Sequence, residues 1–257
     1  MDTRRNFIKK ASILAGAAVV AGKAETISNF AVNKMSGNKL KLSFRPYTLE
    51  LKHVFTLATS SRTTTPVMLT EIQFGDLIGY GEASMPPYLG ESHETATTFL
   101  SKVKLDQFND PFRLEEIIDY IDTVDIGNYA AKASLDIALH DLVGKMIGQP
   151  WFKIWGYDPS KAPNTSFTIG IDKPDVVKEK VREAAEYKIL KVKLGRDTDK
   201  EMIETIRSVS DKPICVDVNQ GWKDKKFALE MIHWLKERGA VFAEQPMDKK
   251  ILTIMHG

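Results

Sequence analysis

Apolar and polar residues alternate along the first ordered part of the chain, from Lys39 to Ala83. Three segments carry this pattern: KLKLSFRPYTLEL at 39–51, PVMLTEIQF at 66–74 and LIGYGEA at 77–83. Gly75 and Asp76 separate the last two segments, as in a tight turn. Period-two alternation with a glycine turn predicts an antiparallel meander of β-strands.

Helical periodicity follows the meander. Asp110 and Pro111 supply an N-cap and a first-turn proline, which predicts a helix over RLEEIIDYIDTV at 113–124. A second helix is predicted over 129–147, because apolar residues recur on one helical stripe and Gly148 then ends the pattern. Meander and helices together predict an α+β module over residues 39–156.

A different rhythm begins after residue 157, where short apolar runs alternate with helical stretches. Strand, helix and strand in repetition predict parallel βαβ units, so the fold class of this half is α/β. Strands are expected at 166–171, 189–195, 213–219 and 241–246, with helices at 173–187, 197–210 and 224–238. A closed (β/α) barrel needs about 250 residues. Residues 157–257 therefore suit either about half of a barrel or a small open sheet.

Composition narrows the classes of function. The chain has 257 residues, a net charge of +2 and one cysteine, Cys215. The near-balanced charge gives no reason to expect a nucleic-acid partner, and one cysteine excludes an intrachain disulfide and a cysteine-cluster metal site.

The N-terminus has the layout of an export signal. A basic segment with Arg4 and Arg5 precedes the apolar run 11–21, and small residues follow. The apolar run is too short to span a bilayer, and the paired arginines fit a twin-arginine signal over residues 1–24. An uncleaved membrane anchor is the alternative. Residues 25–38 are expected to form a polar linker.

Chemistry-bearing residues gather near the ends of the predicted parallel strands. Lys191 and Lys193 share one face of the second strand, Asp217 and Asn219 one face of the third, and Glu244 follows on the fourth. Sites in parallel α/β folds form at these strand ends. Two carboxylates beside two lysines suit a hard, oxygen-binding cation such as Mg²⁺.

Each of these features also has a structural explanation when taken alone. A lysine pair can belong to a solvated sheet edge, Asp217 to a strand-ending turn, and Glu244 to a strand exit. The ordered set KxK, DxN and EQP on successive strands is much harder to obtain by chance.

These motifs resemble the enolase superfamily, in particular the muconate-lactonising subgroup and its dipeptide epimerases. GYGEA at 79–83 is similar to a hairpin of the family's capping domain, and 130–156 to the helix that leads into its barrel. The resemblance implies a capping domain at 39–156 and the first part of a (β/α)7β barrel at 157–257.

The resemblance also implies a reaction and roles. A proton α to a carboxylate or carboxamide is removed and an enolate-type intermediate forms, with Mg²⁺ as cofactor. Lys193 matches the catalytic base, and Lys191 the lysine that stays charged and stabilises the oxyanion. Asp217 and Glu244 match two of three metal ligands, with Asn219 in support.

Substrate recognition in this family involves loops of the capping domain. Arg62 lies where Ala-Glu epimerases carry a glutamate-directed arginine, and Tyr88 lies in a segment that resembles the mobile loop. A surface arginine is the alternative for Arg62. The resemblance therefore favours a small dipeptide of L-Ala-D/L-Glu type as substrate. The twin-arginine signal predicts an exported, periplasmic protein without stable membrane insertion once the signal is cleaved. A cycloisomerase or o-succinylbenzoate synthase reaction is the runner-up, and a homo-oligomer stays open.

The sequence departs from the family pattern in one respect. The resemblance places a third metal ligand on a fifth strand and a lysine for the opposite face on a sixth, and neither precedes Gly257. We therefore expect these 257 residues alone to be an incomplete epimerase. A non-catalytic remnant is the alternative of a different class.

Overall fold

The computed structural model describes residues 37–86 and 89–250. The predicted signal at 1–24, linker residues 25–36 and Tyr88 lie outside these ranges. Contacts divide the chain into two compact units. Residues 65–160 form the first unit together with the segment that precedes Glu50, and residues 50–64 and 161 onward form the second.

The first unit contains the predicted meander. Strands β1 (Lys41–Thr56), β2 (Ser61–Phe74) and β3 (Leu77–Ser84) form one sheet in the order β1-β2-β3. Strands β2 and β3 pair antiparallel, with Phe74 opposite Leu77 across the expected turn. The period-two prediction is therefore confirmed.

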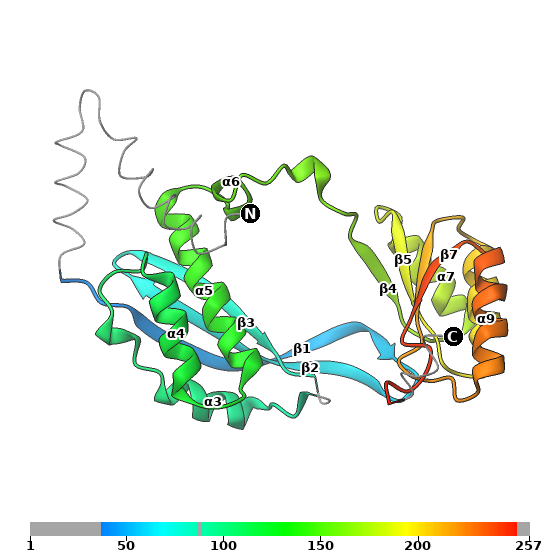
Figure 1. Ribbon diagram of the computed structural model, residues 1–257, viewed down its shortest axis with the longest axis horizontal. Coiled ribbons are helices and arrows are strands. Elements are labelled where there is room, and N and C mark those ends of the chain that lie inside the picture. The colour runs from blue at the N-terminus through cyan, green and yellow to red at the C-terminus, as the bar shows by residue number, and fades with distance from the viewer. Residues whose placement is uncertain (1–36, 87–88, 251–257) are drawn as a thin grey trace. The chain divides into compact units, whose positions relative to one another are not determined.

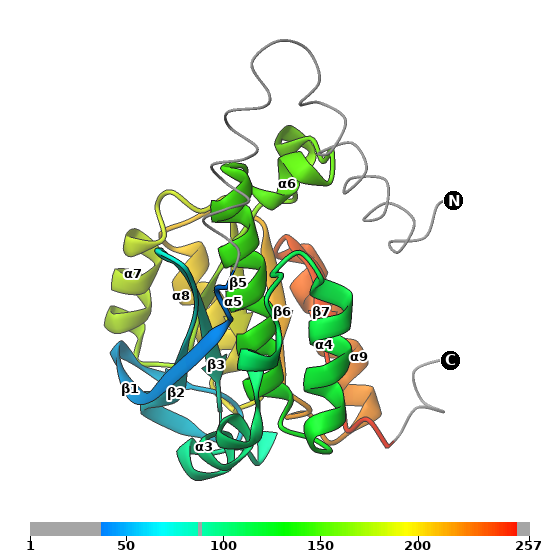
Figure 2. The same ribbon diagram turned by 90° about the vertical axis from the view of Figure 1, so that its left-hand side faces the viewer.

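Helix α5 (Tyr129–Ile147) packs directly on β3, as Figure 1 shows. Two glycines of the GYG segment permit this close approach: a Cβ on Gly79 would lie 2.0 Å from the Ala138 carbonyl oxygen, and one on Gly81 would lie 1.9 Å from that of Ser134. Gly148 ends the helix with a left-handed φ of 69°, as the sequence predicts. The short helix α6 (Trp151–Ile154) follows at its C-terminal end (Figure 2).

Helix α4 (Leu114–Val124) begins later than predicted. Asp110 does not cap it: its carboxylate instead accepts the Phe112 N–H at 3.0 Å, which closes a turn. Arg113 takes the N-cap position without a side-chain capping bond. Among the described residues, this unit also contains α3 (His93–Lys102) and the 3₁₀ turn η2 (Leu105–Gln107), and the 3₁₀ turn η3 (Pro159–Lys161) lies at its boundary with the second unit.

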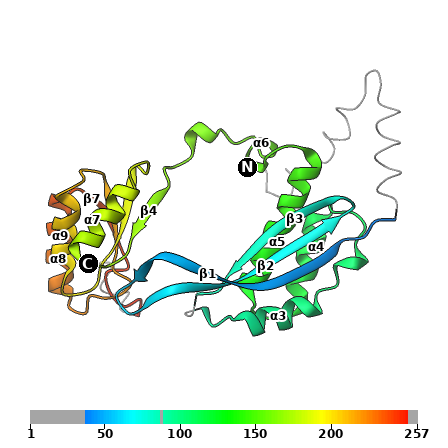
Figure 3. The same cartoon turned by 180° about the vertical axis from the view of Figure 1, so that it is seen from behind.

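The second unit is a parallel α/β layer. Strands β4 (Ser166–Ile169), β5 (Ile189–Lys193), β6 (Ile214–Asp217) and β7 (Ala240–Glu244) pair in parallel and in chain order. Helices α7 (Pro174–Glu183), α8 (Asp199–Arg207) and α9 (Lys225–Glu237) lie together on one side of this sheet, as Figure 3 shows. The predicted βαβ alternation is confirmed.

Alternate residues of β5 divide between the two faces of the sheet. Leu190, Val192 and Leu194 are fully buried in the core shared with the helices. Lys191 and Lys193 therefore project from the opposite face. In the described part of the chain, no helix combines the length and the apolar character needed to span a bilayer.

Candidate active site

The two lysines of β5 converge on one carboxylate of the neighbouring strand. Lys193 and Asp217 are register partners, and the Lys193 Nζ lies 2.6 Å from the Asp217 Oδ2. The Lys191 Nζ lies 3.1 Å from the same oxygen. Parallel pairing thus brings together residues that are 24 positions apart in the sequence.

Glu244 and Asn219 complete this cluster. Glu244 is the register partner of Asp217, and its Oε2 lies 2.6 Å from the Lys191 Nζ. The Asn219 Oδ1 accepts a hydrogen bond of 3.2 Å from Lys193. All five residues that the sequence assigned to the catalytic, metal-ligating and supporting set therefore lie together, and we call Lys191, Lys193, Asp217, Asn219 and Glu244 the lysine–carboxylate cluster.

The electrostatics of the cluster favour charge on both Lys191 and Asp217. Burial disfavours the Lys191 ammonium, but hydrogen bonds to Glu244 and Asp217 outweigh it and raise the pKa of Lys191. Burial likewise disfavours the Asp217 carboxylate, which is only 2% exposed, but hydrogen bonds from Lys193 and Lys191 outweigh it and lower the pKa of Asp217. The expectation that Lys191 keeps its proton agrees with this pKa; the loss of a proton by Lys193 stays a prediction.

The backbone turns sharply after both carboxylate-bearing strands. Asn219, Gln220 and Gln245 have φ values of 48°, 64° and 44°, in the left-handed region that non-glycine residues seldom adopt. Hydrogen bonds between the two turns hold them: the Gln220 N–H donates to the Gln245 carbonyl at 2.8 Å. Such conformations cost about 1–3 kcal/mol each and concentrate at functional sites.

A buried aspartate, which the sequence analysis missed, ties together the loops that follow β5 and β6. Asp199 is 3% exposed and accepts hydrogen bonds from the Gly195 and Arg196 N–H groups at 2.8 and 2.9 Å, and from the Trp222 Nε1 at 2.8 Å. Burial, the largest effect, raises the pKa of Asp199 despite these bonds. Its position in the first turn of α8 looks like an ordinary acidic helix start, so no pattern of residues indicated this role.

Arg62 lies in the second unit, next to an aromatic ring. Its guanidinium carbon is 5.1 Å from the centre of the Phe55 ring, and its Nε is buried without a hydrogen-bond partner. Among the described residues, no carboxylate forms an ion pair with Arg62. Tyr88 lies outside the described residues, and its role stays a prediction.

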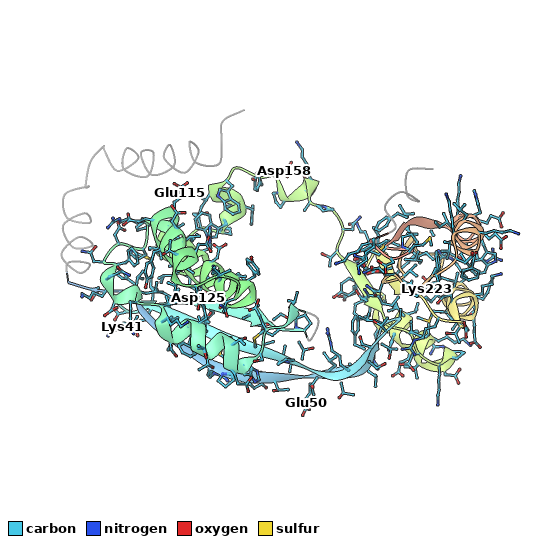
Figure 4. All side chains as sticks on the ribbon, turned by 60° about the horizontal axis from the view of Figure 1, so that its bottom comes forward. Lys41, Glu50, Glu115, Asp125, Asp158 and Lys223 are labelled. Atoms are coloured by element: carbon cyan, nitrogen blue, oxygen red, sulfur yellow. The ribbon has the colours of Figure 1, made fainter. Side chains whose placement is uncertain are left out.

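A surface pocket of about 440 Å³ lies on the outer side of the β5 and β6 loops. Trp222, Phe227 and the exposed Lys223, labelled in Figure 4, are among its lining residues. None of the lysine–carboxylate cluster lines it, so the pocket and the cluster are separate features.

Comparison with known proteins agrees with this geometry. Residues 44–156 match the mandelate racemase / muconate lactonizing enzyme N-terminal domain, and residues 176–255 match an enolase C-terminal domain-like family. The chain is 57% identical, over 98% of its length, to the L-Ala-D/L-Glu epimerase of Bacteroides thetaiotaomicron, of which it covers 68%. The chain belongs to the mandelate racemase / muconate lactonizing enzyme family of the enolase superfamily.

Solved structures of the family have the same fold. The chain aligns with a dipeptide epimerase from Methylococcus capsulatus, complexed with Mg and the dipeptide L-Arg-D-Lys, at a TM-score of 0.73 and 27% identity. It aligns with a substrate-liganded L-Ala-D/L-Glu epimerase from Bacillus subtilis at a TM-score of 0.73 and 25% identity. These alignments include 85% and 84% of this chain, respectively, and 64% of each of the two solved chains. The predicted family and fold are confirmed.

The donor set of the cluster fits a magnesium ion in part. Asp217 and Glu244 are adjacent carboxylates, and Mg²⁺ is commonly held by one or two carboxylates together with water and substrate oxygens. Within residues 37–86 and 89–250, no group of three or more His, Cys, Asp or Glu side chains converges as a metal site. Among the described residues, Asp217 and Glu244 are therefore the candidate ligands, and their binding of a metal stays a prediction.

Proposed function

We propose that these residues belong to a Mg²⁺-dependent dipeptide epimerase of the L-Ala-D/L-Glu type. The observation that carries this proposal is the lysine–carboxylate cluster, in which two lysines and two carboxylates from three adjacent strands meet on one sheet face. The relatives named as dipeptide epimerases support it. The activity is proposed for the whole protein, because the chain covers 68% and 64% of these relatives.

Proton transfer is the task of the two lysines in this proposal. Lys193, nine-tenths buried and next to Asp217, removes the proton from the α-carbon of the substrate. Lys191 keeps its proton, as its raised pKa favours, and stabilises the negative charge that develops on the substrate carbonyl oxygen.

Asp217 and Glu244 are the proposed magnesium ligands, with Asn219 orienting Lys193. A bound Mg²⁺ would supply electrophilic stabilisation of the carbonyl and carboxylate oxygens of the substrate. Each carboxylate has one oxygen outside the lysine contacts: the Glu244 Oε1, and the Asp217 Oδ1, which accepts the Asn219 N–H at 3.0 Å. The carboxylates can therefore meet both the ammonium groups and a cation.

Arg62 is the proposed reader of an acidic second residue in the dipeptide. A guanidinium stacked on Phe55, without a carboxylate partner among the described residues, is available to a substrate carboxylate. Tyr88 stays a proposed lid residue. For the N-terminus we propose twin-arginine export to the periplasm, where peptides derived from peptidoglycan would be substrates.

The test is α-proton exchange in D₂O with L-Ala-L-Glu or L-Ala-D-Glu and Mg²⁺. Two proteins are compared: the 257 residues alone, and a fusion that adds the part of the Bacteroides relative that this chain does not span. We expect the fusion to incorporate deuterium at the α-carbon of the second residue and the 257 residues alone to incorporate none.

Variants of two lysines that lie five positions apart make the test specific. In the fusion, Lys193→Met should slow exchange by about 100-fold or more, since the general base is lost. Lys188→Met, an exposed lysine just before β5, should leave the rate unchanged. Equal rates for the two variants, or no exchange by the fusion with any dipeptide, would rule out this proposal.

A further inference from the structure

The β-hairpin that carries Arg62 belongs to the second unit and contacts helix α7 and the loops that follow β4 and β5. We call residues 50–64 the hairpin arm; it comprises the end of β1, the turn 57–60 and the start of β2. Near the base of the arm, the Glu183 carboxylate on α7 contacts both Lys52 at 2.5 Å and His53 at 2.8 Å. Further along, the Ile171 N–H donates to the Thr56 carbonyl at 3.1 Å.

The turn of the hairpin arm meets the loop that follows the lysine strand. Arg196 reaches this turn with its guanidinium: Nη2 donates to the Leu57 carbonyl at 2.9 Å, and Nε lies 3.4 Å from the Ala58 carbonyl oxygen. The neighbouring Gly195 approaches so closely that a Cβ there would lie 2.7 Å from the Ala58 Cβ. These contacts involve backbone carbonyls of the arm, so they fix the path of its chain rather than one side chain.

The backbone of Arg196 is itself held in place. Its N–H donates to the buried Asp199, which also binds the N–H of Gly195 and the indole of Trp222. Only two residues separate Arg196 from Lys193. The guanidinium therefore connects the turn of the hairpin arm, four residues before Arg62, to a rigid support at the end of the lysine strand.

We propose that Arg196 is a positioning residue that fastens the hairpin arm, and with it Arg62, at a fixed place relative to Lys193. Arg196 acts through the arm and does not touch substrate. Its effect on dipeptide recognition rests on the proposed function, whereas its effect on the arm does not. The two are therefore tested separately.

The first test is hydrogen–deuterium exchange of the 257-residue chain, read by mass spectrometry on peptides of the arm. Arg196→Met removes the guanidinium and keeps a long apolar side chain. We expect exchange in residues 55–62 to accelerate by about tenfold, because hydrogen bonds to a charged donor no longer hold the turn. Arg196→Lys, which can reach one carbonyl but not both, should give an intermediate rate.

Lys226→Met is the matched control, since it removes an exposed positive charge from α9 without touching the arm. Exchange within β2 at 67–74 should be unchanged in every variant, which excludes general destabilisation. If Arg196→Met leaves exchange in residues 55–62 at the parent rate, or accelerates exchange equally throughout the second unit, the proposal is overturned.

The second test measures kinetics in the fusion described above. With L-Ala-L-Glu, Arg196→Met should raise KM by about tenfold while kcat changes by less than about twofold, since the lysines stay in place and Arg62 does not. With a dipeptide whose second residue is neutral, KM should not change. A fall in kcat at constant KM would assign Arg196 to the chemical step and contradict the positioning role. An inactive fusion would refute the proposed function and leave the exchange result to decide the attachment of the arm.

Discussion

At the scale of single residues, Asp217 is the carboxylate that both lysines of the cluster contact. It is 2% exposed and shares one oxygen, Oδ2, between two ammonium groups at 2.6 and 3.1 Å. Taking a carboxylate out of water is costly unless it is paired, and here the pairing prevails, because the pKa of Asp217 is lowered. Removing the negative charge would leave Lys191 paired with Glu244, and Lys193 with the neutral Asn219 side chain in place of a carboxylate.

Asp217→Asn should therefore destabilise the second unit, and the effect should depend on pH. The folded pKa of Asp217 lies below its unfolded value of about 3.9, so the stabilisation is present above about pH 4 and is lost as pH falls through the folded pKa. We expect a loss of about 3 kcal/mol in the free energy of unfolding at pH 7, and a much smaller difference near pH 2.

The single cysteine offers a local probe for this measurement. Cys215 is 5% exposed on β6, and burial raises the pKa of its thiol, so it should react with a thiol reagent only after the second unit opens. Labelling of Cys215 across a urea series gives the free energy. Glu230→Gln on the exposed face of α9 is the control; a loss in Asp217→Asn that is the same at both pH values would show that its charge does not act as described.

Which residues come together could be predicted from the sequence where strand periodicity decides it; their roles stay predictions. A period of two places Lys191 and Lys193 on one face of β5 before any coordinates are known. Asn219 was expected on the same strand face as Asp217, but β6 ends at Asp217 and Asn219 lies in the turn that follows, with a φ of 48°. Asp199 was not predictable, since its partners are two backbone N–H groups and the distant Trp222, and backbone donors leave no trace in the residue types.

At the scale of elements, the loops after β5 and β6 cross with almost no space between them. A Cβ on Gly221 would lie 2.6 Å from the Cα of Gly195, and Gly195 has a φ of +109°. Both positions therefore require glycine, and the Asp199–Trp222 hydrogen bond closes the crossing from the helix side. This crossing fixes how β5 and β6 present Lys193 and Asp217 to each other.

A double-mutant cycle should detect this coupling. Asp199→Asn replaces the carboxylate that accepts the N–H groups with a neutral amide, which has only one acceptor oxygen. Trp222→Phe removes the indole N–H that donates to Asp199 at 2.8 Å. Each substitution alone should lower the free energy of unfolding by about 1–3 kcal/mol. The loss in the double variant should be about 1 kcal/mol smaller than the sum of the two single losses, because both substitutions break the same hydrogen bond. Cys215 labelling reports both.

Trp151→Phe provides the reference cycle, since Trp151 lies in the first unit. Combined with Asp199→Asn, it should give additive losses. Additivity of the Asp199 and Trp222 losses as well would mean that their hydrogen bond does not couple the two loops.

Element types could be predicted from the sequence more securely than element ends. Alternation and helical stripes predicted β4–β7 and α7–α9, because burial on one face imposes those periods. The parts of β1 and β2 at 52–56 and 61–65 were not predicted. The start of α4 was misplaced, since Asp-Pro fits both a helix N-cap and a turn; the choice depends on the Phe112 N–H, which no pattern of residue types records.

At the scale of the whole molecule, two separate cores form along one chain, and the hairpin arm joins the second. The first core lies between α5 and its sheet, and the second between the parallel sheet and α7–α9. The sequence could not assign the arm, since β1 runs without interruption from Lys41 to Thr56, while the contacts of residues 50–64 group them with the second unit. Figure 4 marks Glu50, where this assignment changes.

Binding of Mg²⁺ should therefore stabilise one unit and not the other. Asp217 and Glu244 both belong to the second unit, and a ligand that binds only the folded state adds about 2.7 kcal/mol at a hundred times its Kd. In hydrogen exchange on the 257-residue chain, saturating Mg²⁺ should slow exchange in β6 and β7 by up to about 100-fold, with no change in α5 or β3.

Sodium chloride at the same ionic strength is the first control. It should not slow exchange, because sodium chloride only screens the ion pairs and does not bridge the two carboxylates. Asp217→Asn and Glu244→Gln should each abolish the protection, whereas Glu230→Gln should retain it. Protection that survives in both carboxylate variants, or that appears equally in α5, would place the cation elsewhere and remove the cluster as the magnesium site.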